Sequence, residues 1–106
     1  MEQGSASGLV SEADFDLDAR VRITEHVVRQ AYATETVMLH LETGQYHGVD
    51  PLGARMLDVL QASDSVRAAA GVLANELQRE AAGLEAVLAR FCLRLATREL
   101  VRIDVP

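Results

Sequence analysis

The sequence predicts an α+β fold that is winged helix-turn-helix-like, with a three-stranded antiparallel sheet packed on a three-helix bundle. Short β-prone segments fill the first half of the chain and meet in a tight turn near residues 42–44. Three segments with apolar residues at helical spacing follow, and a short apolar run closes the chain. Strands grouped ahead of helices are typical of a small antiparallel sheet covered on one side by helices.

With 106 residues, the chain has room for a single domain. Residues 1–19 are rich in Gly, Ser and acidic residues, so we expect a disordered acidic tail there and a folded domain over 20–106. The tail lacks the basic start and apolar run of a secretory signal, and no run of eighteen apolar residues occurs. We therefore expect a cytoplasmic protein without a membrane partner.

The predicted strands of the first half cover residues 21–24, 27–32, 36–41 and 45–49. In the third run, alternation puts Val37, Leu39 and Leu41 on one face and the residues between them on the other. A three-residue hairpin loop at 42–44, closed by a glycine, leads into the return strand.

This three-residue loop pairs Leu41 with Gln45, Leu39 with His47, and His40 with Tyr46. The register therefore predicts that His40 and His47 project from opposite faces of the sheet.

The first helix begins directly after the return strand. Asp50 is a favourable N-cap and Pro51 suits the first helical position, whereas Ser65 or Ser63 caps the second helix. A closing strand is expected over 100–105. The apolar faces of the three helices are expected to consist of Leu52, Met56, Leu57 and Leu60; of Val66, Ala69, Val72, Leu73 and Leu77; and of Leu84, Val87, Leu88, Phe91, Cys92 and Leu95.

Sixteen acidic residues against ten arginines, with no lysine, give a formal charge of −6. This charge argues against duplex DNA as a partner. Arg90, Arg94 and Arg98 nevertheless form a basic line at i, i+4 and i+8, which suits a solvated helix end, an anchor for an acidic peptide or a DNA-reading helix. The helix begins with Leu84-Glu85 rather than with base-reading polar residues, so we expect no nucleic-acid partner.

Motifs of catalytic or metal chemistry are absent from the sequence, including nucleophile elbows, phosphate-binding loops and zinc-binding H-E-x-x-H. Cys92, within the apolar run RFCLRL, is interpreted as a small core residue. Histidines on opposite faces cannot share one metal ion, and no residue near His26 has ligand spacing. We therefore expect no enzymatic activity, no metal and no cofactor.

The return strand 45–49 is the remaining candidate site. It contains no proline and no Asp, Glu, Lys or Arg, the features that usually block an exposed edge, and Gly48 permits close approach of another backbone. Such an edge suits the addition of a peptide as an extra strand. Cover by a helix or by the closing strand is the alternative, and the pattern leaves both open.

Three segments carry a resemblance to a known family: VMLHLETGQYHGVDPLGARM at 37–56, SVRAAA at 65–70 and F-x3-L-x4-LV at 91–101. Over residues 27–103 the chain resembles the PqqD family, the small leader-peptide recognition domains known as RiPP recognition elements. The apolar strand, acidic-Thr-Gly turn, aromatic return strand and Pro-x-Gly helix start follow the family pattern. Val49-Asp50, His47 and Glu99 depart from it.

The resemblance implies a non-catalytic protein that binds the leader of a ribosomally made precursor as an added strand, between the return strand and the third helix. It assigns a strand edge, apolar pockets and partners of leader acids. Carried over residue by residue, these are Gln45, Tyr46, His47, Gly48 and Val49; Leu84, Val87, Leu88 and Phe91; and Arg90 and Arg94.

Within the family, the small size and the Gly53-Ala54-Arg55-Met56 helix resemble the stand-alone leader-binding proteins of lasso-peptide biosynthesis. Those proteins act beside a separate cysteine leader protease and a cyclase. A PqqD-type chaperone that presents a peptide to a radical SAM enzyme is the nearest alternative, and a small winged-helix DNA-binding regulator is the alternative from another class. The sequence leaves the oligomeric state open, since without peptide the open edge could pair with a second copy as a homodimer.

Overall fold

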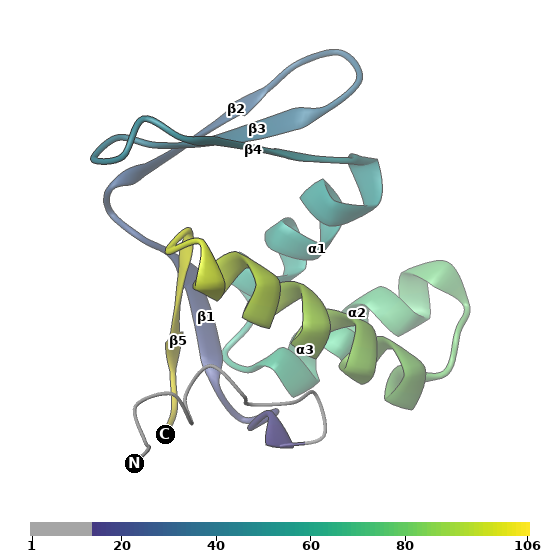
Figure 1. The fold of residues 1–106 in the computed structure, drawn as a ribbon. Helices are drawn as coiled ribbons and strands as arrows, with labels where there is room; N and C mark the ends of the chain where they lie inside the picture. The colour runs from purple at the N-terminus through teal and green to yellow at the C-terminus, as the bar shows by residue number, and fades with distance from the viewer. Residues whose placement is uncertain (1–13) are drawn as a thin grey trace.

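The computed structural model describes residues 14–106 of the protein (Figure 1). Its elements are β1 (Arg20–Ile23), β2 (Val27–Ala31), β3 (Thr36–His40), β4 (Tyr46–Val49), α1 (Pro51–Ala62), α2 (Val66–Leu77), α3 (Ala81–Thr97) and β5 (Val101–Asp104). The predicted α+β class, with a three-stranded antiparallel sheet and three helices, is confirmed.

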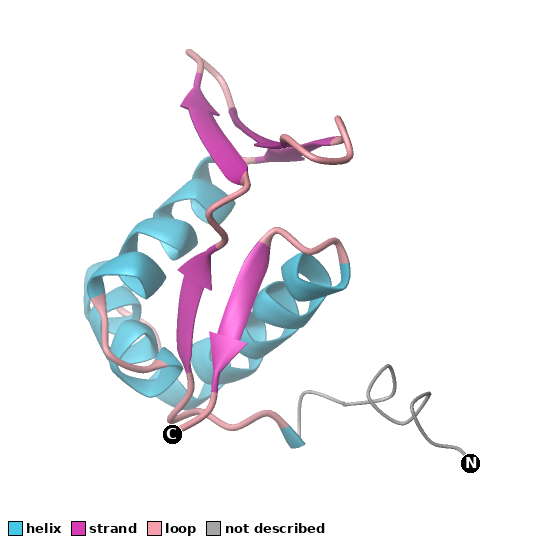
Figure 2. Ribbon diagram, turned by 90° about the vertical axis from the view of Figure 1, so that its left-hand side faces the viewer, coloured by secondary structure: helices cyan, strands magenta, loops and turns pink. Residues whose placement is uncertain are grey.

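The strands form two separate antiparallel sheets. β2, β3 and β4 form the three-stranded sheet in that order, and β1 pairs with β5 from Arg20↔Asp104 to Ile23↔Val101. Figure 2 shows the β1–β5 ribbon lying between the helices, with the three-stranded sheet beyond its end. Among the described strands, β4 therefore has a neighbour on one side only.

The hairpin between β3 and β4 has a four-residue loop, so the predicted register is wrong by one residue. Met38, rather than Leu39, lies opposite His47. The His40 N–H donates across the hairpin to the Gln45 carbonyl at 2.9 Å. The Leu41 N–H points to the other side of β3 and donates to the carbonyl of His26 at 2.8 Å.

The His40 ring supports this wider turn. Its Nδ1 accepts from the backbone N–H groups of Glu42 and Thr43, both at 3.3 Å. Since residues directly opposite share a face, His47 lies on the face of Met38 and His40. The prediction that the two histidines project from opposite faces is therefore wrong.

The helix caps lie where the sequence places them. Asp50 Oδ1 accepts from the Gly53 N–H at 2.7 Å. Of the two candidate serines, Ser65 is the cap, and its hydroxyl accepts from the Ala68 N–H at 3.0 Å.

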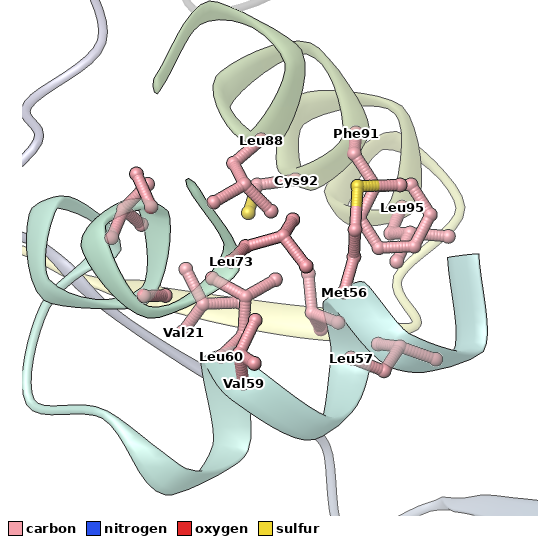
Figure 3. Packing of buried hydrophobic residues seen from close by; sticks show 14 of the residues in the cluster. Val21, Met56, Leu57, Val59, Leu60, Leu73, Leu88, Phe91, Cys92 and Leu95 are labelled. Atoms are coloured by element: carbon pink, nitrogen blue, oxygen red, sulfur yellow. The ribbon is translucent and has the colours of Figure 1, made fainter. Parts of the chain in front are cut away.

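The core lies between the helices and the β1–β5 ribbon, where buried side chains of all three helices pack together with Val21 of β1 (Figure 3). Leu52, Val72 and Leu77, expected on the apolar faces, are instead 46%, 47% and 41% exposed.

The sheet meets the helices through its inner face. Met38 is fully buried there, and Arg29 on β2 donates to the Ala54 carbonyl at 3.1 Å and pairs with Asp58 of α1 at 2.8 Å. The outer face carries the half-buried Val37 and Leu39. The more apolar of the two faces of β3 therefore points away from the helices.

The packed domain also reaches beyond the predicted boundary at residue 20. Ala19 is fully buried, Phe15 and Leu17 pack against the core, and the Leu17 carbonyl accepts from the Arg67 N–H at 2.8 Å. Residues 1–13 of the predicted acidic tail lie outside the described residues.

Candidate functional site

The outer edge of β4 carries backbone groups that pair with no strand of residues 14–106. Paired residues of antiparallel strands alternate between hydrogen-bonded and non-hydrogen-bonded positions. The bond from His40 N–H to the Gln45 carbonyl fixes this alternation, so His47 and Val49 face β3 with their backbone groups. The N–H and C=O groups of Tyr46 and Gly48 consequently point away from the sheet, where no other described strand lies.

A groove runs between β4, the start of α1 and α3, and we refer to it as the β4–α3 groove. Its larger hollow measures about 200 Å³ and is lined by His47, Gly48, Val49, Asp50, Leu52, Gly53, Met56, Phe91 and Arg94. A second, narrow hollow of about 10 Å³ is lined by His40, Gln45, Tyr46, His47, Arg98 and Leu100. Because His47 lines both, the hollows adjoin along the strand.

Gly53 allows the helices and the strand to come together at the floor of the groove. A Cβ at this position would lie 3.1 Å from Val49 Cβ, 3.2 Å from Asp50 Oδ1 and 3.5 Å from Phe91 Cε1. At Gly48, by contrast, a Cβ would meet only the carboxylate of the exposed Glu35, at 3.0 Å. The floor is thus tightly packed, while the edge has room to adapt.

The groove is cationic although the chain carries a formal charge of −6. Arg94 lies 5.7 Å from the Phe91 ring centroid, and no carboxylate of residues 14–106 pairs with Arg94 or Arg98. Burial, followed by the charges of Arg98 and Arg94, lowers the pKa of His47. Asp50, the acid that lines the groove, is occupied as the cap of α1.

The structure gathers seven of the predicted site residues at this groove. All five residues of the predicted edge line it, as do two residues of α3, Phe91 and Arg94. The remaining predicted residues, Leu84, Val87, Leu88 and Arg90, do not line either hollow.

Leu84 and Leu88, predicted as peptide pockets, are core residues instead. Leu88 has no exposed surface and Leu84 is 9% exposed, because their side of α3 packs against the other helices. Val87 packs against the edge of the same core, and Arg90 is exposed but engaged in an interaction.

Several groove residues were not predicted. Arg98, one helical turn beyond Arg94, belongs to the basic line that the sequence displays, so its role was accessible from the pattern. His40, Leu52, Gly53, Met56 and Leu100 enter the groove only through the tertiary arrangement of the helices.

Metal or thiol chemistry finds no support in the described part of the chain. No group of three or more His, Cys, Asp or Glu side chains there is arranged to hold a metal ion. Cys92 is fully buried, and burial raises the pKa of its thiol to about 12. None of the helices in residues 14–106 is long and apolar enough to cross a membrane.

Comparisons with known proteins agree with this geometry. The family model described as coenzyme PQQ synthesis protein D (PqqD) matches residues 35–101. Among solved structures, the chain is similar to TbiB1 in complex with the TbiA(beta) leader peptide, with 30% sequence identity and a TM-score of 0.70. That similarity covers 76% of this chain and 94% of the TbiB1 chain. No curated protein matches the chain.

Proposed function

The chain belongs to the PqqD family, and from this premise we propose that it is a RiPP recognition element that binds the leader peptide of a ribosomally synthesised precursor. The leader adds as an extended strand to β4, and its side chains enter the β4–α3 groove. The observation that carries the proposal is the open edge of β4, with the backbone groups of Tyr46 and Gly48 facing outward beside a groove on α3. The similar TbiB1 structure, which contains a leader peptide, supports it.

Strand addition accounts for the composition of this edge. Backbone hydrogen bonds supply an affinity that does not depend on the peptide's sequence, and pockets for alternate side chains supply specificity. Tyr46, 75% exposed on the outer face, and the groove on the inner face provide such contacts on both sides of an added strand.

We further propose that the chain acts without catalysis of its own, as the leader-binding partner of a separate cysteine leader protease and a cyclase in lasso-peptide biosynthesis. A bound leader raises the effective concentration of the precursor at an enzyme that binds the same complex. The burial of Cys92 and the lack of a metal-binding group of side chains among residues 14–106 are compatible with this division of labour.

A second candidate function has support in the family description, which names coenzyme PQQ synthesis. In that case the chain presents its peptide to a radical SAM enzyme. The adjacent genes discriminate the two proposals, because a precursor beside a cysteine protease favours the lasso assignment. DNA binding as a winged-helix regulator has less support, because Arg94 and Arg98 line the groove rather than an open convex face.

Amide NMR and hydrogen exchange with a synthetic leader, taken from the precursor gene next to the gene of this chain, test the proposal. In the free protein the amides of Tyr46 and Gly48 are expected to exchange rapidly, while those of His47 and Val49 are protected by β3. On binding, Tyr46 and Gly48 become protected, and shift changes extend to Phe91–Arg98. Leader binding without protection of Tyr46 and Gly48 contradicts strand addition at β4, and no binding at high peptide concentration contradicts the function.

A further inference from the structure

His40 presents a buried hydrogen-bond donor that has no partner among the residues that the structure describes. The side chain is 4% exposed, and its Nδ1 accepts the two backbone N–H groups of the hairpin loop. A neutral imidazole whose Nδ1 accepts carries its proton on Nε2. No acceptor for this Nε2–H is found among residues 14–106. Buried donors are ordinarily satisfied, because leaving one unpaired costs free energy.

The ring of His40 lines the narrow hollow at the beginning of β4. The volume of about 10 Å³ matches one oxygen-sized group rather than a larger fragment. Arg98, Gln45 and His47 also line this hollow, and they bring a full positive charge and further hydrogen-bond donors to it. No carboxylate of the described residues neutralises Arg98.

We propose that this hollow is a carboxylate subsite for an aspartate or glutamate side chain of the bound peptide. One carboxylate oxygen enters the hollow and accepts from His40 Nε2–H, and the carboxylate pairs with the guanidinium of Arg98. Arg94, on the next turn of α3 toward its N-terminus, adds a second cation that pairs with no carboxylate of residues 14–106. This inference rests on the proposed leader binding and specifies the ligand, a leader with an acidic residue facing the first residues of β4.

A carboxylate fits this hollow better than a neutral group. Arg98 and His40 Nε2 offer donors only, and hydrogen bonds with a charged partner are about twice as strong as those between neutral groups. A water molecule would satisfy His40 but would leave Arg98 without a counterion. Although the protein as a whole is acidic, this local positive charge favours an acidic segment over a basic one at the groove.

The proposal also gives binding a pH dependence through His47. The charged and titratable groups facing this histidine are His40 on β3, Arg94 on α3, Arg98 at the C-cap of α3, and Asp50 at the start of α1. A carboxylate beside it raises the His47 pKa from its lowered value in the free protein. Binding therefore takes up a proton. The affinity is highest below the pKa of the free state and falls as the pH rises through the pKa of the bound state.

Isothermal titration calorimetry with the synthetic leader of the neighbouring precursor tests the subsite. Arg98→Glu is expected to weaken binding about ten-fold or more, because it removes a charge-assisted hydrogen bond and adds repulsion. Leader variants in which each acidic residue in turn is replaced by lysine then identify the ligand. One of them restores the binding of the Arg98→Glu protein while binding poorly to the wild type.

Arg79→Glu is the matched control, because it makes the same change in net charge on the α2–α3 connection, where Arg79 lines a different hollow. Its affinity for the leader is expected to equal that of the wild type. Leader binding that both arginine variants retain within about two-fold overturns the carboxylate subsite, while the proposed function stands. The carboxylate subsite is also overturned if a leader without any acidic residue protects the β4 amides from hydrogen exchange. If the wild type fails to bind the leader, the proposed function and the subsite are both wrong.

Discussion

The free donor at Gly48 provides a direct test of strand addition. Proline at this position removes one N–H that points outward from β4, while the pairing of His47 and Val49 with β3 is left intact. Proline is tolerated on an edge strand when its missing N–H faces solvent. Its Cβ would meet the carboxylate of Glu35, a flexible and exposed side chain that can move away. Gly48→Pro is therefore expected to fold.

The expected loss of affinity follows from that one donor. An added peptide strand would leave a carbonyl unpaired in a partly buried groove, which costs about 1–3 kcal/mol. At about 2 kcal/mol, the Kd for the leader rises about 30-fold at 25 °C. Bulk of the proline ring beside the incoming backbone increases the loss.

Fluorescence anisotropy with a labelled leader measures this change, with circular dichroism as the check on folding. Gly48→Ala is the matched control, since it adds the same Cβ but keeps the N–H, and its Kd is expected within about three-fold of the wild type. His47→Pro removes an N–H that faces β3 and is expected to destabilise the domain. A folded Gly48→Pro protein with wild-type affinity refutes the outward assignment. An equal loss in Gly48→Ala attributes the effect to the added Cβ.

Three further predictions concern the core and the frame of the groove. Gly53→Ala is expected to lower the free energy of unfolding, measured by urea titration, by about 1–2 kcal/mol, because the new Cβ would lie 3.1 Å from Val49 Cβ. Helix propensity alone predicts a gain of about 1 kcal/mol, and such a gain would contradict this packing. Arg29→Ala removes the 2.8 Å ion pair with Asp58 and a hydrogen bond to the Ala54 carbonyl of α1. The expected loss of stability, about 1 kcal/mol, corresponds to a fall in Tm of about 4–8 °C. Adding Asp58→Ala to this variant is expected to cause little further loss, because the ion pair is already broken. Because burial raises the pKa of the Cys92 thiol to about 12, a thiol reagent at pH 8 is expected to react no faster than the protein unfolds, and rapid labelling of the native state contradicts its burial.

Local chemistry explains which parts of the fold could be predicted. The start of α1 depends on a cap and a proline within two residues, Asp50 and Pro51, and the structure shows this cap in place. The hairpin register depends on contacts that the local pattern does not contain. The Leu41 N–H donates to the carbonyl of His26, the residue before β2, and not to the returning strand, and the loop is held by the ring of His40. One additional loop residue then reversed the predicted relation between the two histidines.

The rotation of α3 was the other feature that the sequence could not determine. Its apolar residues span more than one face of the helix, and only the neighbouring elements decide which of them meet the core. Leu88 and Leu95 point fully into the core, whereas Arg94 and Arg98 point to the groove.

Phe91 belongs to both regions. Its side chain is 3% exposed, yet it lines the groove. The ring packs close to Gly53 and lies below the guanidinium of Arg94. Truncating this ring would create a cavity in the core and enlarge the groove at once, so a loss of binding there would not separate recognition from stability. The edge at Gly48 and the cation at Arg98 lack this double role, because both are exposed. They are therefore the positions at which binding can be altered while the fold is kept.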